Sequence, residues 1–187
     1  VVPFFLSAWG VREYGEWLVL TSIPLFLAML ELGVAEASAT KATLASGSKD
    51  INAVKKIIDT AMAFSIATAI TVAIIGNALA FSEPWDRYLK LTDINADNAS
   101  IIFSCMSFYL ACNFLAGPIS AWLKAMDRTA LSAFSTANRG AAEMIATAIA
   151  LIVGAGPTAL AATLLATCFT TVVLYYIVAL RHSSIGA

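Results

Sequence analysis

The residues of this 187-residue chain that could do chemistry are a few polar groups set inside long apolar runs. Arg139 and Glu143 lie four residues apart, so one helical turn would place both side chains on the same face, where they can neutralise each other. Asn113 lies in the middle of another apolar run. An ionisable group at membrane depth costs roughly 2.5–3.5 kcal/mol on insertion scales, so few are kept without a role. We expect Arg139, Glu143 and Asn113 to line a polar, substrate-binding cavity. For Arg139 and Glu143, the alternative is an ion pair at the cytoplasmic rim.

Two proline sites interrupt the apolar runs. Pro24 lies in one run, and Gly117-Pro118 follows Asn113 by four residues in another. Proline removes a backbone hydrogen bond and kinks a helix, and broken helices near mid-membrane are common at gates and sites of transporters. We predict that Pro24, Gly117 and Pro118 form kinks that gate the site. Static kinks that only shape packing are the alternative.

Few other groups suggest chemistry. Glu31 and Asp59 are candidates for ion coupling, with water-exposed interfacial carboxylates as the alternative. The three cysteines, at positions 105, 112 and 168, form no Cys-x-x-Cys and all fall in apolar runs, which favours small core residues. There is no Gly-rich phosphate loop, His-Glu-x-x-His or Gly-x-Ser-x-Gly motif. We therefore predict no metal, no cofactor and no enzymatic activity.

The composition indicates which elements must position these groups. The chain is 60% hydrophobic and 12% charged, with a mean hydropathy of +0.83, whereas soluble domains are about 45–50% apolar and about 25% charged. Its net charge is −1, so no basic surplus exists for nucleic acid. These values exclude a disordered chain, a nucleic-acid binder and an ordinary soluble enzyme, and they predict an all-α, polytopic transmembrane bundle.

The apolar runs define about six helices in one transmembrane domain covering 1–187. A helix needs about 20 residues to cross the hydrocarbon layer. The predicted spans are 1–9, 14–33, 57–81, 99–123, 140–155 and 158–180. The first run is too short to cross and begins with Val1, so we interpret it as the end of a truncated helix and the chain as a fragment.

Lysine and arginine predict the orientation. Eight of the eleven lie on the side of the second-to-third and fourth-to-fifth connections and of the C-terminal end. They are Lys41, Lys49, Lys55, Lys56, Lys124, Arg128, Arg139 and Arg181. Because cytoplasmic loops carry the excess of basic residues, these connections and the C-terminal end are predicted to be cytoplasmic.

Several short motifs in the chain resemble those of a known family. They are Val2-Pro3-Phe4-Phe5-Leu6-Ser7-x-Trp9-Gly10, Tyr14-Gly15-Glu16-Trp17-Leu18, Glu31-Leu32-Gly33, Asn113-x-x-x-Gly117-Pro118 and Lys124-Ala-Met-Asp127-Arg128. In these motifs the chain resembles the N-terminal half of bacterial polysaccharide and O-antigen flippases, the lipid-linked oligosaccharide translocases of the MATE-like MOP flippase superfamily. Glu31 stands where the family more commonly has aspartate.

The resemblance implies one lobe of a two-lobed transporter in the bacterial inner (plasma) membrane. It implies translocation of polyprenyl-pyrophosphate-linked oligosaccharide, an O-antigen or lipopolysaccharide repeat unit, by alternating access driven by an ion gradient. Arg139 would contact this anionic substrate. The expected partners are that substrate, the lipid bilayer and the missing second lobe, with no nucleic acid.

Three other functions are alternatives to this expectation. A MATE-type drug/cation antiporter would favour carboxylates inside the membrane, and Glu143 is one, although Arg139 neutralises it. A polyprenyl-phosphate transferase would need clustered Asp or His for metal and phosphate, which the sequence lacks. A non-transporting membrane scaffold is the third alternative.

Overall fold

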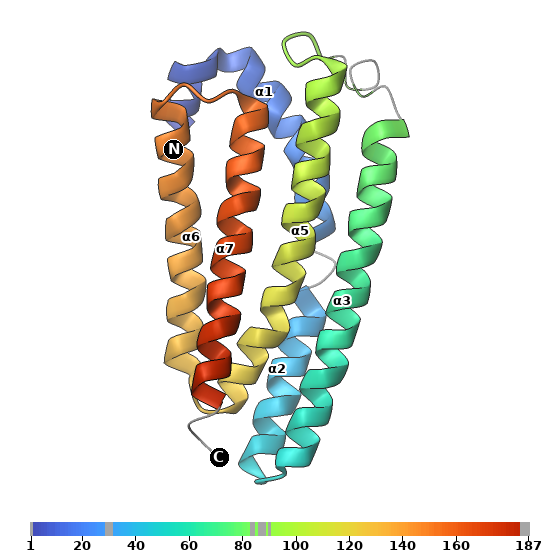
Figure 1. Cartoon of the computed structure of the whole chain (residues 1–187), viewed down its shortest axis with the longest axis vertical. Helices are drawn as coiled ribbons and strands as arrows, with labels where there is room; N and C mark the ends of the chain where they lie inside the picture. Colours follow the sequence, from blue (N-terminus) through green and yellow to red (C-terminus); the bar gives the residue numbers. More distant parts are fainter. Residues whose placement is uncertain (1, 29–31, 83–84, 86–88, 90, 184–187) are drawn as a thin grey trace.

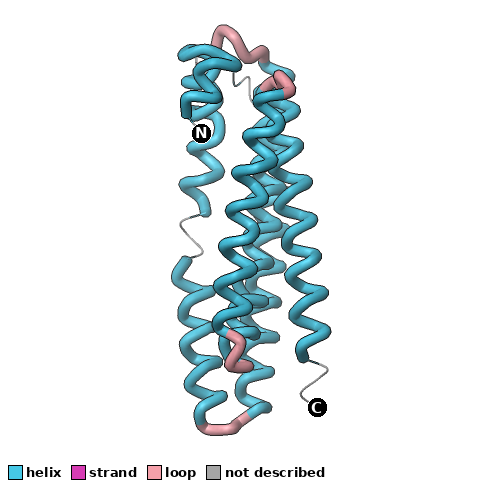
Figure 2. The backbone as a smooth tube through the Cα atoms, turned by 90° about the vertical axis from the view of Figure 1, so that its left-hand side faces the viewer, coloured by secondary structure: helices cyan, strands magenta, loops and turns pink. Residues whose placement is uncertain are grey.

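The computed structural model describes residues 2–28, 32–82, 85, 89 and 91–183. Within these residues it contains helices and no strand. The main helices are α1 (Val2–Ala28), α2 (Leu32–Gly47), α3 (Ile51–Ser82), α5 (Ala96–Ala125), α6 (Thr129–Ile152) and α7 (Pro157–Ser183). Helices α3, α5, α6 and α7 run side by side along the long axis of the molecule, and α2 lies below α1 (Figure 1). The tube view shows the same elongated bundle from the side (Figure 2). The predicted all-α bundle is confirmed.

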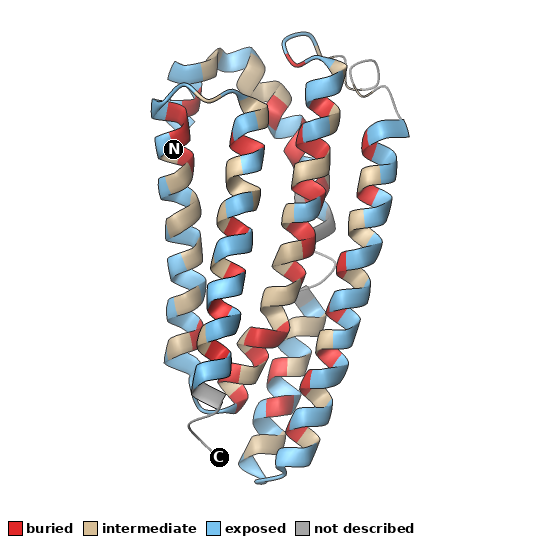
Figure 3. Ribbon diagram, in the orientation of Figure 1, coloured by how far each residue is buried: buried red, intermediate tan, exposed pale blue. Residues whose placement is uncertain are grey.

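The bundle has large apolar side chains on its outside. Ile74 on α3 and Ile152 on α6 are 65% and 72% exposed, and exposed positions cover the outer faces of the long helices (Figure 3). Among the described helices, α3, α5 and α7 are long and apolar enough to cross a membrane. Because large apolar surfaces of this kind are not stable in water, the chain is a multi-pass membrane protein, as predicted.

The connections alternate between the two ends of the bundle. The turns 48–50 and 126–128 lie at the lower end in Figure 1, near the C-terminus, whereas the α3–α5 and α6–α7 connections lie at the upper end with the N-terminus. In the lower turn between α2 and α3, Asp50 caps α3 by accepting a hydrogen bond from the Ala53 amide at 2.9 Å. The lysine-rich connections therefore share one end, called the basic end below.

Helix α1 has two arms that meet at Gly10. Gly10 has a φ of 78°, a left-handed conformation that glycine adopts without a Cβ clash. The predicted separation between the run 1–9 and the next span is therefore a kink in one helix. The first arm lies across the upper end (Figure 1), where the Trp9 indole donates to the Ala155 carbonyl at 2.8 Å. Phe5 stacks on Tyr14, and Trp9 meets Trp17 edge-on, so aromatic rings pack together at this end.

Helix α5 is central and contacts each of the other five helices. Its side chains Ile102, Phe114 and Leu123 are buried. It approaches α3 closely at Gly76, where a Cβ atom would overlap the Ser107 side chain. The lower, yellow part of α5 leans toward α6 and α7 (Figure 1), and this part contains the buried Pro118. Helix α5 thus forms one wall of a space that α6 and α7 also enclose.

The largest difference from the predicted spans is at α6. The sequence predicts a short span over 140–155, but the helix begins at Thr129. The hydrophobic run begins late because one face of α6 is polar over its first half, and only the opposite face is apolar. Arg139 and Glu143 consequently lie in the middle of a 24-residue helix and not at its start.

Candidate functional site

A cavity of about 730 Å³ lies between α5, α6 and α7, with Pro24, Ala35 and Glu36 of α1 and α2 at its border. Its polar lining residues are Glu36, Tyr109, Asn113, Ser120, Lys124, Thr129, Ser132, Ser135, Thr136, Arg139, Thr171 and Tyr175. Four different helices therefore turn polar groups toward one space inside an otherwise apolar bundle. A pocket with apolar walls and a few convergent polar groups is the usual form of a small-molecule site.

The inward face of α6 supplies much of this polarity. Its polar residues follow a spacing of three or four, which places them on one helical face. They are Ser132, Thr136, Arg139, Glu143 and Thr147. On the outward face, Phe134, Ile145 and Ile149 are exposed. Helix α6 is thus amphipathic, with its polar side toward the cavity. A surface helix of a soluble protein has the reverse arrangement, with its polar side toward the surrounding water.

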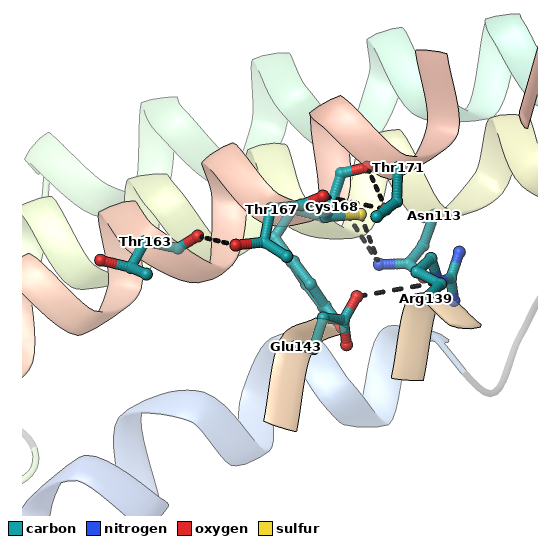
Figure 4. A network of polar contacts seen from close by, with 8 residues as sticks. Asn113, Arg139, Glu143, Thr163, Thr167, Cys168 and Thr171 are labelled. Atoms are coloured by element: carbon teal, nitrogen blue, oxygen red, sulfur yellow. Dashed lines mark hydrogen bonds and ion pairs between the residues drawn. The ribbon is translucent and has the colours of Figure 1, made fainter. Parts of the chain in front are cut away.

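Arg139 and Glu143 form an ion pair inside the bundle. The Arg139 Nε lies 3.7 Å from Glu143 Oε1, and the two side chains are only 25% and 18% exposed. The Tyr109 hydroxyl of α5 donates to Glu143 Oε2 at 3.0 Å. Glu143 Oε1 is buried and accepts no hydrogen bond from the described residues. Figure 4 shows Arg139 with its terminal nitrogens turned away from Glu143. Arg139 and Glu143 therefore form the ion pair that their spacing allows, and the pair lies next to the cavity in the middle of α6.

Asn113 lies beside this pair. Its Nδ2 donates to the Tyr109 carbonyl at 3.0 Å and approaches the Cys168 sulfur of α7 at 3.6 Å. On α7, Thr167 and Thr171 donate to carbonyls one turn back, at 2.8 and 2.9 Å (Figure 4). A threonine that donates to its own helix has only acceptor lone pairs left for a ligand. The middle of the cavity thus combines one cation with neutral polar groups.

A second cation lies nearer the basic end. Lys124 Nζ is 3.2 Å from Glu36 Oε1, and this contact joins α5 to α2 at the cavity border. Ser132 lies between Ser120 and Tyr175, with hydroxyl contacts of 2.8 and 3.2 Å. Sequence reasoning used Lys124 only for orientation and a motif, and it missed Tyr109, Ser132 and Tyr175. The four-residue spacing from Tyr109 to Asn113 places Tyr109 on the same helical face as a predicted site residue.

The structure brings most of the predicted site residues together. Arg139, Asn113, Pro24 and Gly117 line the cavity, and Glu143 contacts it through Arg139 and Tyr109. Pro118 is buried in α5 next to Gly117.

Of the two predicted coupling carboxylates, only Asp59 lies in the part of the chain that the structure describes. Glu31 lies outside the described residues. Asp59 is exposed on α3, and no α3 residue belongs to the described cavity lining. Within the described residues, no group of three or more His, Cys, Asp or Glu is arranged to hold a metal ion.

A helical membrane protein whose polar groups face an internal cavity has the architecture of a transporter domain. Comparison with protein families matches residues 4–140 to MatE. The match covers most of the chain, and the chain therefore belongs to the MatE family, whose members are transporters and not enzymes. No curated protein and no solved structure matches the chain.

Proposed function

We propose that this protein translocates a polyprenyl-pyrophosphate-linked oligosaccharide across a bacterial inner membrane by alternating access, in polysaccharide biosynthesis. Transport in general follows from membership of the MatE family. The observation that supports this substrate is Arg139, which lines the cavity while its terminal N–H groups make no hydrogen bond to the described residues. A guanidinium with free N–H groups binds two phosphate oxygens at once.

The rest of the lining suits the two parts of this substrate. Lys124 gives a second cation for a pyrophosphate, which carries more negative charge than Arg139 alone can balance. The hydroxyl oxygens of Thr136 and Thr171, which line the cavity, are able to accept hydrogen bonds from sugar hydroxyls. In this proposal the basic end faces the cytoplasm, because it carries the excess of lysine and arginine. A second lobe of the transporter completes the cavity.

A MATE-type drug/cation antiporter is the second candidate, and one observation favours it. Each cation of the cavity has a carboxylate partner, Glu36 for Lys124 and Glu143 for Arg139. The four charges sum to zero, so the cavity has no net charge to exclude a cationic substrate. In this alternative Glu143 would bind the cation. A scaffold without transport has no comparable observation in its favour.

The test replaces Arg139 in the full-length protein, reconstituted in proteoliposomes with a fluorescent polyprenyl-pyrophosphate-linked oligosaccharide. Hydrogen bonds to charged groups contribute about 1.5–3 kcal/mol, so Arg139→Ala should lower translocation by at least about tenfold. Arg139→Lys should keep part of it, because it retains the charge but loses the planar fork. Arg128→Ala removes an arginine at the exposed start of the same helix and is the matched control.

Two results would contradict the flippase proposal. One is unchanged translocation by Arg139→Ala at normal membrane levels. The other is efflux of a cationic dye by the wild type that Glu143→Gln abolishes, with no translocation of the lipid-linked oligosaccharide. The second result would establish the antiporter.

A further inference from the structure

We propose that Ser120 is an anion-binding residue of the cavity and that Tyr175 is its positioning residue. The hydroxyl groups of Tyr175, Ser132 and Ser120 form a chain across three helices, and this chain directs the Ser120 O–H toward a phosphate oxygen of the substrate. The inference rests on the proposed function, because it requires an anionic ligand. It assigns a role in binding to two residues that the sequence did not single out.

The chain of hydroxyl groups joins α7 to α6 and α6 to α5. The Tyr175 hydroxyl of α7 donates a hydrogen bond to Ser132 Oγ of α6 at 3.2 Å. Ser132 Oγ in turn lies 2.8 Å from Ser120 Oγ of α5. Because Ser132 is only 1% exposed, its hydroxyl has to find its partners within the protein. These two contacts are therefore the means by which the buried Ser132 hydroxyl is satisfied.

The number of hydrogens in the chain determines its direction. A hydroxyl group has one hydrogen to donate and two lone pairs to accept with. Ser132 Oγ accepts the Tyr175 hydrogen, so its own hydrogen needs an acceptor, and Ser120 Oγ is the one that the described residues provide. The reverse direction would leave the hydrogen of the buried Ser132 unpaired, which is unfavourable. Ser120 therefore accepts from Ser132 and keeps its own hydrogen for a ligand in the cavity that it lines.

Lys124 supplies the charge next to this donor. It follows Ser120 by four residues on α5, which places it one helical turn nearer the basic end, and both residues line the cavity. An ammonium group has three hydrogens to donate, and the contact with Glu36 at 3.2 Å uses one of them. The remaining N–H groups and the Ser120 O–H suit an oxygen with negative charge. A pyrophosphate esterified at both ends carries only acceptors, whereas a sugar hydroxyl also has a hydrogen to place.

The experiment measures the binding of inorganic pyrophosphate to the full-length protein in nanodiscs by calorimetry, in buffer without divalent metal. Ser120→Ala removes a hydrogen bond to a charged group and should weaken binding by at least about tenfold. Tyr175→Phe should weaken it by about two- to tenfold, the range for a neutral hydrogen bond. Without the Tyr175 hydrogen, Ser132 Oγ is free to accept from Ser120, and the Ser120 O–H then turns away from the ligand.

A double variant and two controls separate positioning from packing. If Tyr175 acts through the Ser120 hydroxyl, Ser120→Ala combined with Tyr175→Phe should bind pyrophosphate as weakly as Ser120→Ala alone. Ser120→Thr retains the hydroxyl and should keep most of the affinity. Tyr176→Phe changes an exposed neighbour on α7 and is the matched control. In the translocation assay, Ser120→Ala should raise the substrate concentration for half-maximal rate and leave the maximal rate nearly unchanged.

The outcomes separate this inference from the proposed function. Pyrophosphate binding that depends on Arg139 but is unchanged in Ser120→Ala would overturn the inference and leave the anionic substrate intact. A lower melting temperature of Tyr175→Phe in detergent with unchanged affinity would show that the tyrosine only packs, and additive losses in the double variant would show that it does not act through Ser120. Either result would overturn its positioning role. Absence of pyrophosphate binding by the wild type would contradict the inference and the anionic substrate together.

Discussion

Replacing Glu16 should destabilise the contact between α1 and the connection of α3 to α5 at the upper end of the bundle. Its carboxylate accepts hydrogen bonds from the Thr92 amide and hydroxyl at 2.8 Å, from the Ile94 amide at 2.8 Å, and from the Asp93 amide at 3.1–3.2 Å. It thereby ties α1 to the connection between α3 and α5. In Glu16→Gln, one of the two acceptor oxygens becomes an NH₂ group that faces N–H donors, so two of these contacts turn repulsive.

The expected loss of stability follows from the number of contacts. A buried hydrogen bond to a charged group contributes about 1.5–3 kcal/mol, but Glu16 is only partly buried, and water competes for it. We therefore take about 0.5 kcal/mol for each of the four donors and expect about 2 kcal/mol in total. Glu16→Ala should cost a similar amount.

The pH dependence gives the sign of the effect. Burial raises the pKa of Glu16, but the hydrogen bonds from Thr92, Ile94 and Asp93 lower it more, so its pKa lies below 4.5 in the folded protein. A carboxylate with a lowered folded pKa contributes stability that is fully present above the unfolded value and is lost as the pH falls through the folded value. The difference in unfolding free energy between the wild type and Glu16→Gln should therefore shrink below pH 4.5.

The loss of stability is measured by hydrogen–deuterium exchange at residues 92–94 and by thermal unfolding in detergent. Glu13→Gln is the matched control: burial, and then the charges of Asp93 and Glu16, raise the pKa of Glu13, so its ionised form is disfavoured in the folded state. Neutralising Glu13 should be neutral or slightly stabilising at neutral pH. Equal exchange in Glu16→Gln and the wild type, or equal destabilisation by the two substitutions, would refute the reasoning.

Two further predictions concern helix packing and the second cation. Gly76→Ala should lower the melting temperature in detergent by an amount corresponding to about 1–3 kcal/mol, because the new Cβ overlaps Ser107; Ser107→Gly in the same chain should restore it. Gly140→Ala, where a Cβ meets nothing within 4 Å, should be neutral or stabilising, and an equal loss in both glycine variants would contradict the packing argument. Lys124→Gln should raise the substrate concentration needed for half-maximal translocation while leaving thermal stability nearly unchanged, since its partner Glu36 is 72% exposed and such ion pairs contribute about 0–1 kcal/mol. A large loss of stability without a change in translocation would show that Lys124 has a structural role.

Much of the fold could be predicted from hydropathy alone. The all-α bundle, the alternation of its connections and the gathering of the basic loops at one end all follow from the lengths of the apolar runs and the places of lysine and arginine. For Arg139 the sequence leaves two positions open, a polar cavity or an ion pair at the cytoplasmic rim, because an arginine four residues before a glutamate inside the membrane needs a polar environment.

The remainder depended on the two faces of one helix, which averaged hydropathy does not separate, and on contacts between segments far apart in the sequence. Helix α6 was predicted too short because a window of hydropathy averages its two faces, and the polar face of Ser132, Thr136 and Arg139 hides the apolar one. The pairing of Lys124 with Glu36 spans 88 residues of sequence. The hydrogen bonds of Glu16 to residues 92–94 likewise depend on how α1 lies against a distant connection.

The two-sided character of α6 has a consequence for biosynthesis. An isolated α6 leaving the ribosome would carry Arg139 and Glu143 toward lipid, each at a cost of roughly 2.5–3.5 kcal/mol on insertion scales. Helix α7 is strongly apolar and follows after the short connection 153–156. We therefore expect α6 and α7, which pack against each other, to enter the membrane together as a hairpin. Truncating the nascent chain before position 157 would leave α6 on the membrane surface.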